Sequence, residues 1–542
     1  MKEKYADILF PLALESLLTY RVPEDLCPQP GPGCQVTAPV GNRIHTGVVY
    51  RIGEEPPQGG PKDSLRDIIS VVPSLPLIPE KTLMFWEWIA RYYMCPPGLV
   101  AKMALGLWKF KRRAKGPATD PKPFPDPGPP LYLEGMGRET VYRKNIGMAL
   151  DRGGQCLIVC PDRFSCESVH QFMLDAFGEK AICFHSKRPL KEQSKAQKEL
   201  YAGNPCVVTG MHLALLLPFT RPALVVVERE EHPAHKKSES VPYLNARDTA
   251  LMMGQQFHAQ VILGSALPSL ETLYNIEKGK FTALEPIPAA LPMPEKNVLI
   301  DTAASLTTGT MRGALDLRTL AAVENCLAEQ KKILFAEAGP SFPEDLPQDT
   351  GILVCRPFQT HHHLDSSIGL VCFLHTERLL SRKHFRATEQ ACHIMANVLR
   401  WAAVQTPRVP VMIQSSDMDH PFYRFVREGL PASFMDDILQ ERIRYGYPPH
   451  TRQILITIFH HRKNLAADRS RALCRVLDSA SLPARIEGPF VPPERRELLF
   501  SYRLQVTIQR TVNAQPVKER ISSLIRQAAL APARIRVDVD PA

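Results

Sequence analysis

The strongest constraint on the fold is a change of pattern after residue 130. From that point short apolar runs alternate with polar segments of helical period, as in the run at 156–160 and the amphipathic segment at 163–177. The alternation continues through apolar runs at 181–185, 206–210, 224–228 and 261–266. Strands that alternate with helices form a parallel sheet. The middle of the chain is therefore predicted to be α/β.

A second group of apolar runs predicts another α/β layer, at 332–338, 351–355, 369–375 and 409–415. The segment after residue 450 has a strand and helix order typical of a small α+β domain. Residues 1–108 contain short strands, turns and an aromatic helical segment at 83–93, which indicates a small β-rich module closed by a helix.

A proline-rich segment separates the first module from the α/β region. Residues 116–130 contain seven prolines and no apolar stripe, which predicts an extended linker. Five cations in seven residues precede it, at Lys109, Lys111, Arg112, Arg113 and Lys115. Two interpretations stay open: a solvated helix end, or a strap that contacts phosphates between two domains. The formal net charge of +10 favours a polyanionic partner.

Composition excludes several classes of protein. An apolar fraction of 44% is that of a folded protein. No apolar run reaches the ~18 residues of a membrane span, and acids interrupt the first residues before a signal-peptide core forms, so we expect a cytoplasmic protein and no membrane partner. The 13 cysteines include no C-x₂-C pair, which favours buried reduced cysteines over a metal site.

Three strings in the α/β region carry a family resemblance. They are Arg229-Glu230-Glu231-His232, Asn245-Ala246-Arg247-Asp248 and VILGSALPSLET at 261–272. Their order and spacing resemble the first lobe of the PriA replication-restart helicase family, also called primosomal protein N′. Strings at 19–23, 33–36, 39–41, 47–49 and 90–93 resemble its 3′-DNA-end-binding domain. Strings at 444–449, 488–489, 502–503 and 537–541 resemble its C-terminal domain.

The resemblance implies a multidomain α/β chain. It places a β-rich 3′-DNA-end-binding domain at 1–112, a proline-rich linker at 113–130, two degenerate RecA-like helicase lobes at 131–290 and 291–435, and an α+β C-terminal domain at 436–542. The winged helix of the family is missing, since only the linker stands in its place. The zinc region is missing too, because residues 338–350 contain no cysteine. We therefore expect no zinc.

The segment that resembles a Walker A motif has lost its phosphate-binding groups. Its loop between Gly135 and Gly137 is three residues short. Arg138 stands where the lysine belongs, and Glu139 where a hydroxyl ligates Mg²⁺. Each like-charge pair between Glu139 and a triphosphate at ~4 Å costs several kcal/mol at an effective dielectric of ~20. ATP and Mg²⁺ are therefore not expected as cofactors.

The acidic motif and the second lobe are degraded as well. Arg229 replaces the first acid of the motif, which leaves Glu230, Glu231 and His232; a register using Glu228 would place that acid on the other face of the strand. In the second lobe only Arg400 matches an arginine of the family. The run His361-His362-His363 is interpreted as a solvent-exposed loop, because consecutive side chains diverge. We assign no catalytic residue and no metal ligand.

DNA binding is the function with surviving parts. The resemblance places Thr19 at the position of an aspartate that binds a terminal 3′ nucleotide. Tyr20, Gly41, Arg43 and the basic strap are further candidates for stacking and phosphate contacts. For Tyr20 the alternative is a core tyrosine with a satisfied hydroxyl. The aromatic residues Trp86, Trp88, Tyr92 and Tyr93 have helical spacing and are interpreted as core.

These observations lead to three hypotheses. The first is a replication-restart protein, a pseudo-helicase that binds forked or 3′-ended DNA and recruits primosome and helicase-loader proteins, with single-stranded-DNA-binding protein as a further partner. It would act at the bacterial nucleoid, in DNA replication, repair and recombination. The second is a divergent ATP-dependent 3′–5′ DNA helicase, which alone would need ATP and Mg²⁺. The third is a decaying chain, or one whose role depends on an intact paralogue.

Overall fold

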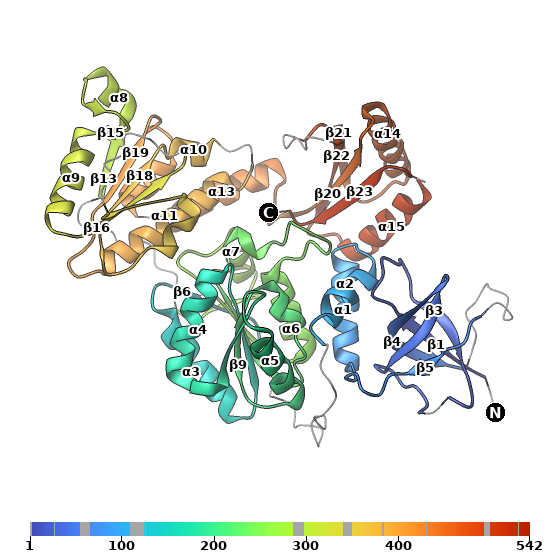
Figure 1. Cartoon of the computed structure of the whole chain (residues 1–542). Coiled ribbons are helices and arrows are strands. Elements are labelled where there is room, and N and C mark those ends of the chain that lie inside the picture. The colour runs from blue at the N-terminus through green and yellow to red at the C-terminus, as the bar shows by residue number, and fades with distance from the viewer. Residues whose placement is uncertain are drawn as a thin grey trace.

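The computed structural model describes residues 3–26, 28–54, 65–108, 124, 126–285, 297–339, 350–381, 384–429, 431–492, 499–528 and 530–541. It confirms the predicted fold class. A β-rich N-terminal domain, two α/β domains and a C-terminal domain of mixed α and β structure follow one another (Figure 1). We call the two α/β domains lobe 1 and lobe 2. Among the described residues no helix is long and apolar enough to cross a bilayer.

The N-terminal domain is an antiparallel sheet in the order β2-β1-β4-β3-β5, with β1 (Lys4–Leu9), β2 (Leu18–Val22), β3 (Gln35–Val40), β4 (Arg43–Gly53) and β5 (Ser70–Val71). One face of the sheet buries apolar side chains, among them Ile8, Val36 and Val49. Helices α1 (Glu80–Tyr92) and α2 (Pro97–Leu105) follow. They lie between this sheet and the rest of the molecule (Figure 1).

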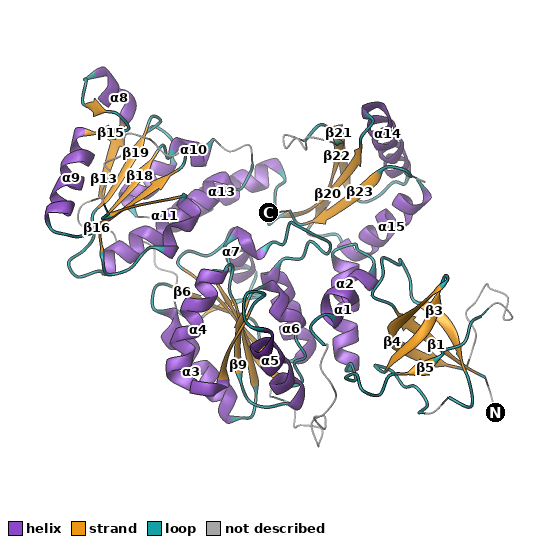
Figure 2. Cartoon of the chain, in the orientation of Figure 1, coloured by secondary structure: helices purple, strands orange, loops and turns teal. Residues whose placement is uncertain are grey.

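Lobe 1 is a parallel sheet with helices on both faces, as the alternating pattern predicts (Figure 2). Its strands are β6 (Leu131–Glu134), β7 (Gln155–Val159), β8 (Ala181–Phe184), β9 (Val207–Gly210), β10 (Pro222–Glu228), β11 (Gln260–Ser265) and β12 (Thr282–Ala283), in the order β12-β6-β11-β10-β7-β9-β8. Its helices are α3 (Arg138–Asp151), α4 (Arg163–Phe177), α5 (Leu190–Ala202), α6 (Ala246–Phe257) and α7 (Leu270–Glu277), with short 3₁₀ turns at 178–180, 212–216 and 233–235. Every residue of β7 is buried, which is typical of a strand covered on both faces.

Lobe 2 is a second parallel sheet, in the order β13-β19-β18-β16-β17. Its strands are β13 (Asn297–Asp301), β16 (Lys332–Glu337), β17 (Ile352–Cys355), β18 (Ile368–Leu374) and β19 (Val411–Ser415), beside a small hairpin of β14 (Met311–Arg312) and β15 (Leu315–Asp316). Its helices are α8 (Thr302–Thr307), α9 (Leu317–Ala328), the 3₁₀ helix η5 (Pro357–His362), α10 (Glu377–Leu380), α11 (Ala387–Val404) and α12 (Phe422–Glu428). Helix α13 (Pro431–Tyr445) then leads to the last domain.

The C-terminal domain has an antiparallel sheet in the order β21-β22-β20-β23. Its elements are β20 (Thr451–His460), α14 (Lys463–Ser479), β21 (Arg485–Phe490), β22 (Phe500–Gln509), α15 (Ala514–Gln527) and β23 (Arg534–Val539). Isoleucines at every second position of β20 are buried, as expected for a sheet with one apolar face. A single hydrophobic cluster runs from α1 through lobe 1 into this domain.

Candidate functional site

The turn from β6 to α3 is formed by the segment that resembles a Walker A motif in the sequence. Gly135 has φ +111° and Gly137 has φ +72°, backbone conformations that side chains other than glycine rarely adopt. The N–H of Gly135 donates to the carbonyl of Ser265 at the end of β11, at 3.0 Å. This amide is therefore committed to the sheet. Glu139 follows in the first turn of α3, half-buried.

A buried ion pair lies at this turn. The Arg138 guanidinium contacts the carboxylate of Glu228, with Nε 3.3 Å from Oε2, and Nη1 donates to the carbonyl of Gly135. The Tyr142 hydroxyl donates to the same carboxylate at 2.7 Å. Burial alone would lower the pKa of Arg138, but Glu228 raises it well above its ordinary value; in return Arg138 lowers the pKa of Glu228 against the effect of burial. Both groups are therefore held in their charged forms.

A second ion pair joins the two lobes at the same turn. Arg400 Nη2, from α11, contacts Glu134 Oε1 at the end of β6. The two side chains are only 7% and 5% exposed. Burial raises the pKa of Glu134 to about 7, although the attraction of Arg400 acts in the opposite direction. The arginine that the sequence marks as a remnant thus reaches the loop and pairs with a carboxylate of the chain.

The acids of the motif at 228–231 point to three different partners. Glu228 pairs with Arg138, as described above. Glu230 accepts hydrogen bonds from the N–H of Ser269 at 2.8 Å, from its hydroxyl at 2.9 Å and from Arg247 Nη1 at 3.1 Å. Glu231 lies 3.7 Å from Arg229 Nε, and burial raises its pKa. Burial also lowers the pKa of His232 to about 2, so this ring is neutral at pH 7.

Glu230 begins a series of buried and partly buried charges that we call the inter-lobe ion chain. It is formed in order by Glu230, Arg247, Glu271, Arg386, Glu389 and Arg442. Its closest contacts are Arg386 to Glu271 at 2.6 Å and Arg442 to Glu389 at 2.8 Å. The first three residues belong to lobe 1, the next two to the region of α11, and the last to α13. Charges of alternating sign therefore connect the two lobes.

A cavity of about 950 Å³ lies where α1, the two lobes and the C-terminal domain meet. Its wall includes Glu230, Glu231 and His232. Cations such as Arg452 and acids such as Asp540 line it together. The segment that resembles an acidic helicase motif in the sequence therefore faces this cavity.

The structure places Thr19 and Tyr20 in different surroundings. The Thr19 hydroxyl donates to Asp7 Oδ1 at 2.6 Å, and Asp7 also pairs with Arg51. Tyr20 is only 4% exposed; its ring packs edge-on against Phe10, and its hydroxyl donates to the carbonyl of Pro39 at 2.8 Å. The ring of Tyr20 is thus a core element and offers no free face to a base, which is the alternative considered for it.

The other DNA-binding candidates form an exposed turn and a segment that is not described. Gly41, at φ +58°, turns the chain between β3 and β4, and Arg43 begins β4 with an exposed side chain. The basic strap with Lys109, Lys111, Arg112 and Arg113 lies outside the described residues, as does most of the proline-rich linker.

The histidine run corrects one expectation. His361 and His362 end the 3₁₀ helix η5 and face Asp162 of lobe 1; their side chains are 13% and 27% exposed. The prediction of a solvent-exposed loop is wrong for both, because the packing of lobe 2 against lobe 1 covers them. The histidine run can be recognised in the sequence, but its contact with lobe 1 depends on how the two lobes pack.

Comparison with known proteins matches a family model to the domain at each end of the chain. Residues 7–106 match the model of the PriA 3′ DNA-binding domain, and residues 444–542 match that of the primosomal protein N C-terminal domain. Both ends of the chain are PriA-family domains. Replication restart protein PriA of Rickettsia felis is 28% identical over 299 residues, which cover 51% of this chain and 45% of that protein. The homologue from Chlamydia pneumoniae is 32% identical over 150 residues, 28% of this chain and 20% of that protein. The chain thus spans about half the length of the PriA proteins that it matches.

Two solved helicase structures resemble the chain more distantly. RecG bound to a three-way DNA junction is 15% identical, with a TM-score of 0.34, and the match covers 68% of this chain and 48% of RecG. The Hef helicase domain of Pyrococcus furiosus is 11% identical, with a TM-score of 0.33, and the match covers 55% of this chain and 95% of that domain.

Several residues of the site had no role predicted from the sequence. Glu134 directly precedes Gly135, and Asp7 lies on the strand beside Thr19. Arg247 belongs to one of the strings that carry the family resemblance. The position of Glu134 next to the loop could have marked it as a candidate. No sequence signal links Asp7 to Thr19, since their contact depends on strand register.

Proposed function

We propose that this chain is a replication-restart protein that binds forked or 3′-ended DNA and helps recruit the helicase-loading machinery of the primosome, without ATP-driven unwinding. The matches to the PriA 3′ DNA-binding domain and C-terminal domain support the DNA-binding part. One observation carries the absence of unwinding: the buried ion pair of Arg138 and Glu228 at the former phosphate loop. Primosome proteins and single-stranded-DNA-binding protein are the proposed partners, at the bacterial nucleoid.

The ion pairs at the loop compete with a nucleotide. A P-loop binds Mg·ATP through free backbone amides, a lysine and a hydroxyl. Here Arg138 is committed to Glu228 and Arg400 to Glu134. Breaking one buried pair costs about 3–5 kcal/mol. Two such losses use up the roughly 8 kcal/mol that a micromolar site provides. ATP and Mg²⁺ are therefore not part of the proposal.

An ATPase assay of the full chain tests this part. With forked DNA present, we expect ATP turnover and strand separation at background level. Restoring lysine with Arg138→Lys leaves turnover at background, because Glu139 and the shortened loop persist. Turnover well above background that disappears in Glu231→Gln would contradict the proposal. That result would favour the alternative, a divergent 3′–5′ helicase.

Fork binding tests the DNA-binding part. Phosphate contacts release counterions, so the affinity for a fork with a free 3′ end is expected to fall steeply with salt. Arg43→Ala weakens binding and reduces the slope of log affinity against log salt by about 1. Arg424→Ala, which removes an exposed arginine of α12 in lobe 2, is the matched control. Affinity that is flat with salt, or equal for forks with and without a 3′ end, would count against the proposal.

The third hypothesis has a separate test. An intact PriA relative encoded in the same genome would leave this chain free of a catalytic role. If such a relative exists and deleting this chain leaves fork restart unchanged, the chain has no restart function of its own.

A further inference from the structure

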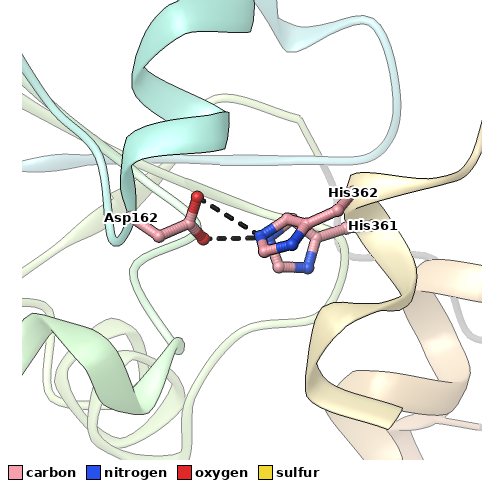
Figure 3. A group of neighbouring side chains, drawn as sticks. All are labelled: Asp162, His361 and His362. Atoms are coloured by element: carbon pink, nitrogen blue, oxygen red, sulfur yellow. Dashed lines mark hydrogen bonds and ion pairs between the residues drawn. The ribbon is translucent and has the colours of Figure 1, made fainter. Parts of the chain in front are cut away.

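Three side chains from two lobes converge at one point of the lobe interface (Figure 3). Asp162 follows β7 and caps α4, where its Oδ1 accepts the N–H of Ser165 at 2.8 Å. His361 Nε2 lies 2.9 Å from Asp162 Oδ2, and His362 Nε2 lies 3.5 Å from Oδ1. One carboxylate of lobe 1 thus faces two imidazoles of lobe 2.

Consecutive residues of a 3₁₀ helix point about 120° apart, yet the side chains of His361 and His362 in η5 turn toward the same carboxylate. They are its last two residues, and their ring centroids are 4.2 Å apart. The carboxylate of Asp162 offers one oxygen to each ring. The objection that neighbouring side chains diverge holds for an isolated segment. Here both rings face the same carboxylate of the other lobe (Figure 3).

The distances suit a small divalent ion. The three ligand atoms lie within 4.8 Å of one another. Tetrahedral zinc has bonds of about 2.0–2.2 Å to nitrogen and oxygen, which places neighbouring ligand atoms roughly 3.3–3.6 Å apart. Binding would therefore lengthen the 2.9 Å between His361 Nε2 and Asp162 Oδ2 by roughly half an ångström, whereas the 3.5 Å between His362 Nε2 and Oδ1 already suits the ion.

The surroundings leave this group short of partners. Nδ1 of His361 and Nε2 of His362 are buried and make no hydrogen bond. Phe164 covers one side, with its ring centroid 4.8 Å from that of His362. The nearby cation Arg229 lies 3.7 Å from Glu231, which offsets its charge.

We propose that Asp162, His361 and His362 form a binding site for a divalent transition-metal ion of the zinc class, which joins lobe 1 to lobe 2. Water completes the tetrahedron. Two imidazoles and one carboxylate favour zinc-class ions over Mg²⁺ and Ca²⁺, which prefer oxygen ligands. The site uses no cysteine and does not depend on the proposed DNA function.

Cobalt titration of the full chain, treated first with a chelator, tests the site. We expect one equivalent of Co²⁺ to bind with the visible absorption of a tetrahedral ion and without a thiolate-to-cobalt band, and Zn²⁺ to displace it. His361→Gln, His362→Gln and Asp162→Asn each weaken binding about tenfold or more. His363→Gln is the matched control, since His363 belongs to the same run but not to the group of three.

A second measurement separates metal loss from misfolding. Circular dichroism confirms that each variant is folded, and the melting temperature is recorded with and without Zn²⁺. Zinc raises the melting temperature of the parent and of His363→Gln, and leaves that of His362→Gln unchanged. The proposal is overturned if cobalt does not bind, if it binds with a thiolate band, or if His361→Gln and His362→Gln bind as tightly as the parent.

Discussion

At the scale of single residues, three buried arginines of the two lobes are held by ion pairs. Arg138, Arg229 and Arg400 each face a carboxylate of the same chain. A guanidinium is planar and binds both oxygens of a carboxylate, which a lysine ammonium does not do. Arginine at position 138 therefore contacts both oxygens of Glu228, which a lysine could not do in the same way.

Removal of Arg138 alone is expected to destabilise the protein strongly. Arg138→Met leaves the Glu228 carboxylate buried without its cation, which costs about 3–5 kcal/mol of the free energy of unfolding. The double variant Arg138→Met/Glu228→Leu recovers most of this loss, because it removes both charges. Chemical denaturation measures both values. A double variant as unstable as the single one would show that the ion pair is not the cause.

Buried histidines predict a loss of stability in acid. Burial lowers the pKa of His235 to about 4, below the ordinary 6.5. The unfolded chain therefore binds a proton between pH 6.5 and 4 that the folded protein does not, so stability falls as the pH falls through this window. A shift of this size corresponds to about 3 kcal/mol.

His235→Gln tests this pH dependence. Its amide can keep the hydrogen bond that His235 Nε2 makes to the carbonyl of Glu228 at 3.0 Å. Unfolding measured from pH 7 to pH 4 should then decline less steeply than in the parent. A glutamine at the exposed His461 is the control. Equal slopes for His235→Gln and the parent would refute the assignment.

At the scale of helices and strands, periodicity predicts most of the fold. The apolar run at 224–228 lies within β10, and the segment at 163–177 is α4 from its first residue to its last. The contacts of the site are less predictable, because they join distant parts of the chain. Asp162 and His361 are 199 residues apart, and Glu134 and Arg400 are 266 apart. Nothing in the local pattern around these residues encodes how two lobes dock.

Substitution by alanine is expected to change stability in opposite directions at two helical glycines, Gly98 and Gly147. A Cβ at Gly98 in α2 would lie 1.9 Å from the carbonyl oxygen of Leu12, so Gly98→Ala forces the helix away from the N-terminal sheet and costs about 1–3 kcal/mol. A Cβ at Gly147 in α3 would meet only the ring of Phe177, at 3.8 Å. Gly147→Ala therefore stabilises the helix by about 0.5–1 kcal/mol. Thermal unfolding of both variants checks the signs, and equal signs would contradict the packing described for α2.

At the scale of the whole molecule, charges hold the lobes against each other. The inter-lobe ion chain and the pair of Glu134 and Arg400 both cross the interface. These ion pairs stabilise the lobe interface without a bound nucleotide. The relative position of the lobes is therefore expected to be the same with and without ATP.

A double-mutant cycle on Glu134 and Arg400 measures this coupling. We expect Arg400→Leu to be more destabilising than Arg400→Leu/Glu134→Leu, with a coupling energy of about 0.5–3 kcal/mol. Hydrogen exchange should become faster at the start of α3 and in α11 in the single variant. Additive effects of the two substitutions would show that the pair does not join the lobes.

The last strand, β23, and the residue after it contact parts of the molecule that are synthesised much earlier. Lys236 of lobe 1 donates to the carbonyl of Val539, 303 residues later, and the Tyr92 hydroxyl of α1 donates to Asp540, 448 residues later. A ribosome that adds 5–20 residues per second needs roughly 15–60 s to cover the first of these intervals. During that time Lys236 lacks the carbonyl that it later contacts. Lobe 1 is therefore fully synthesised well before β23, the strand that completes its contacts with the C-terminal domain.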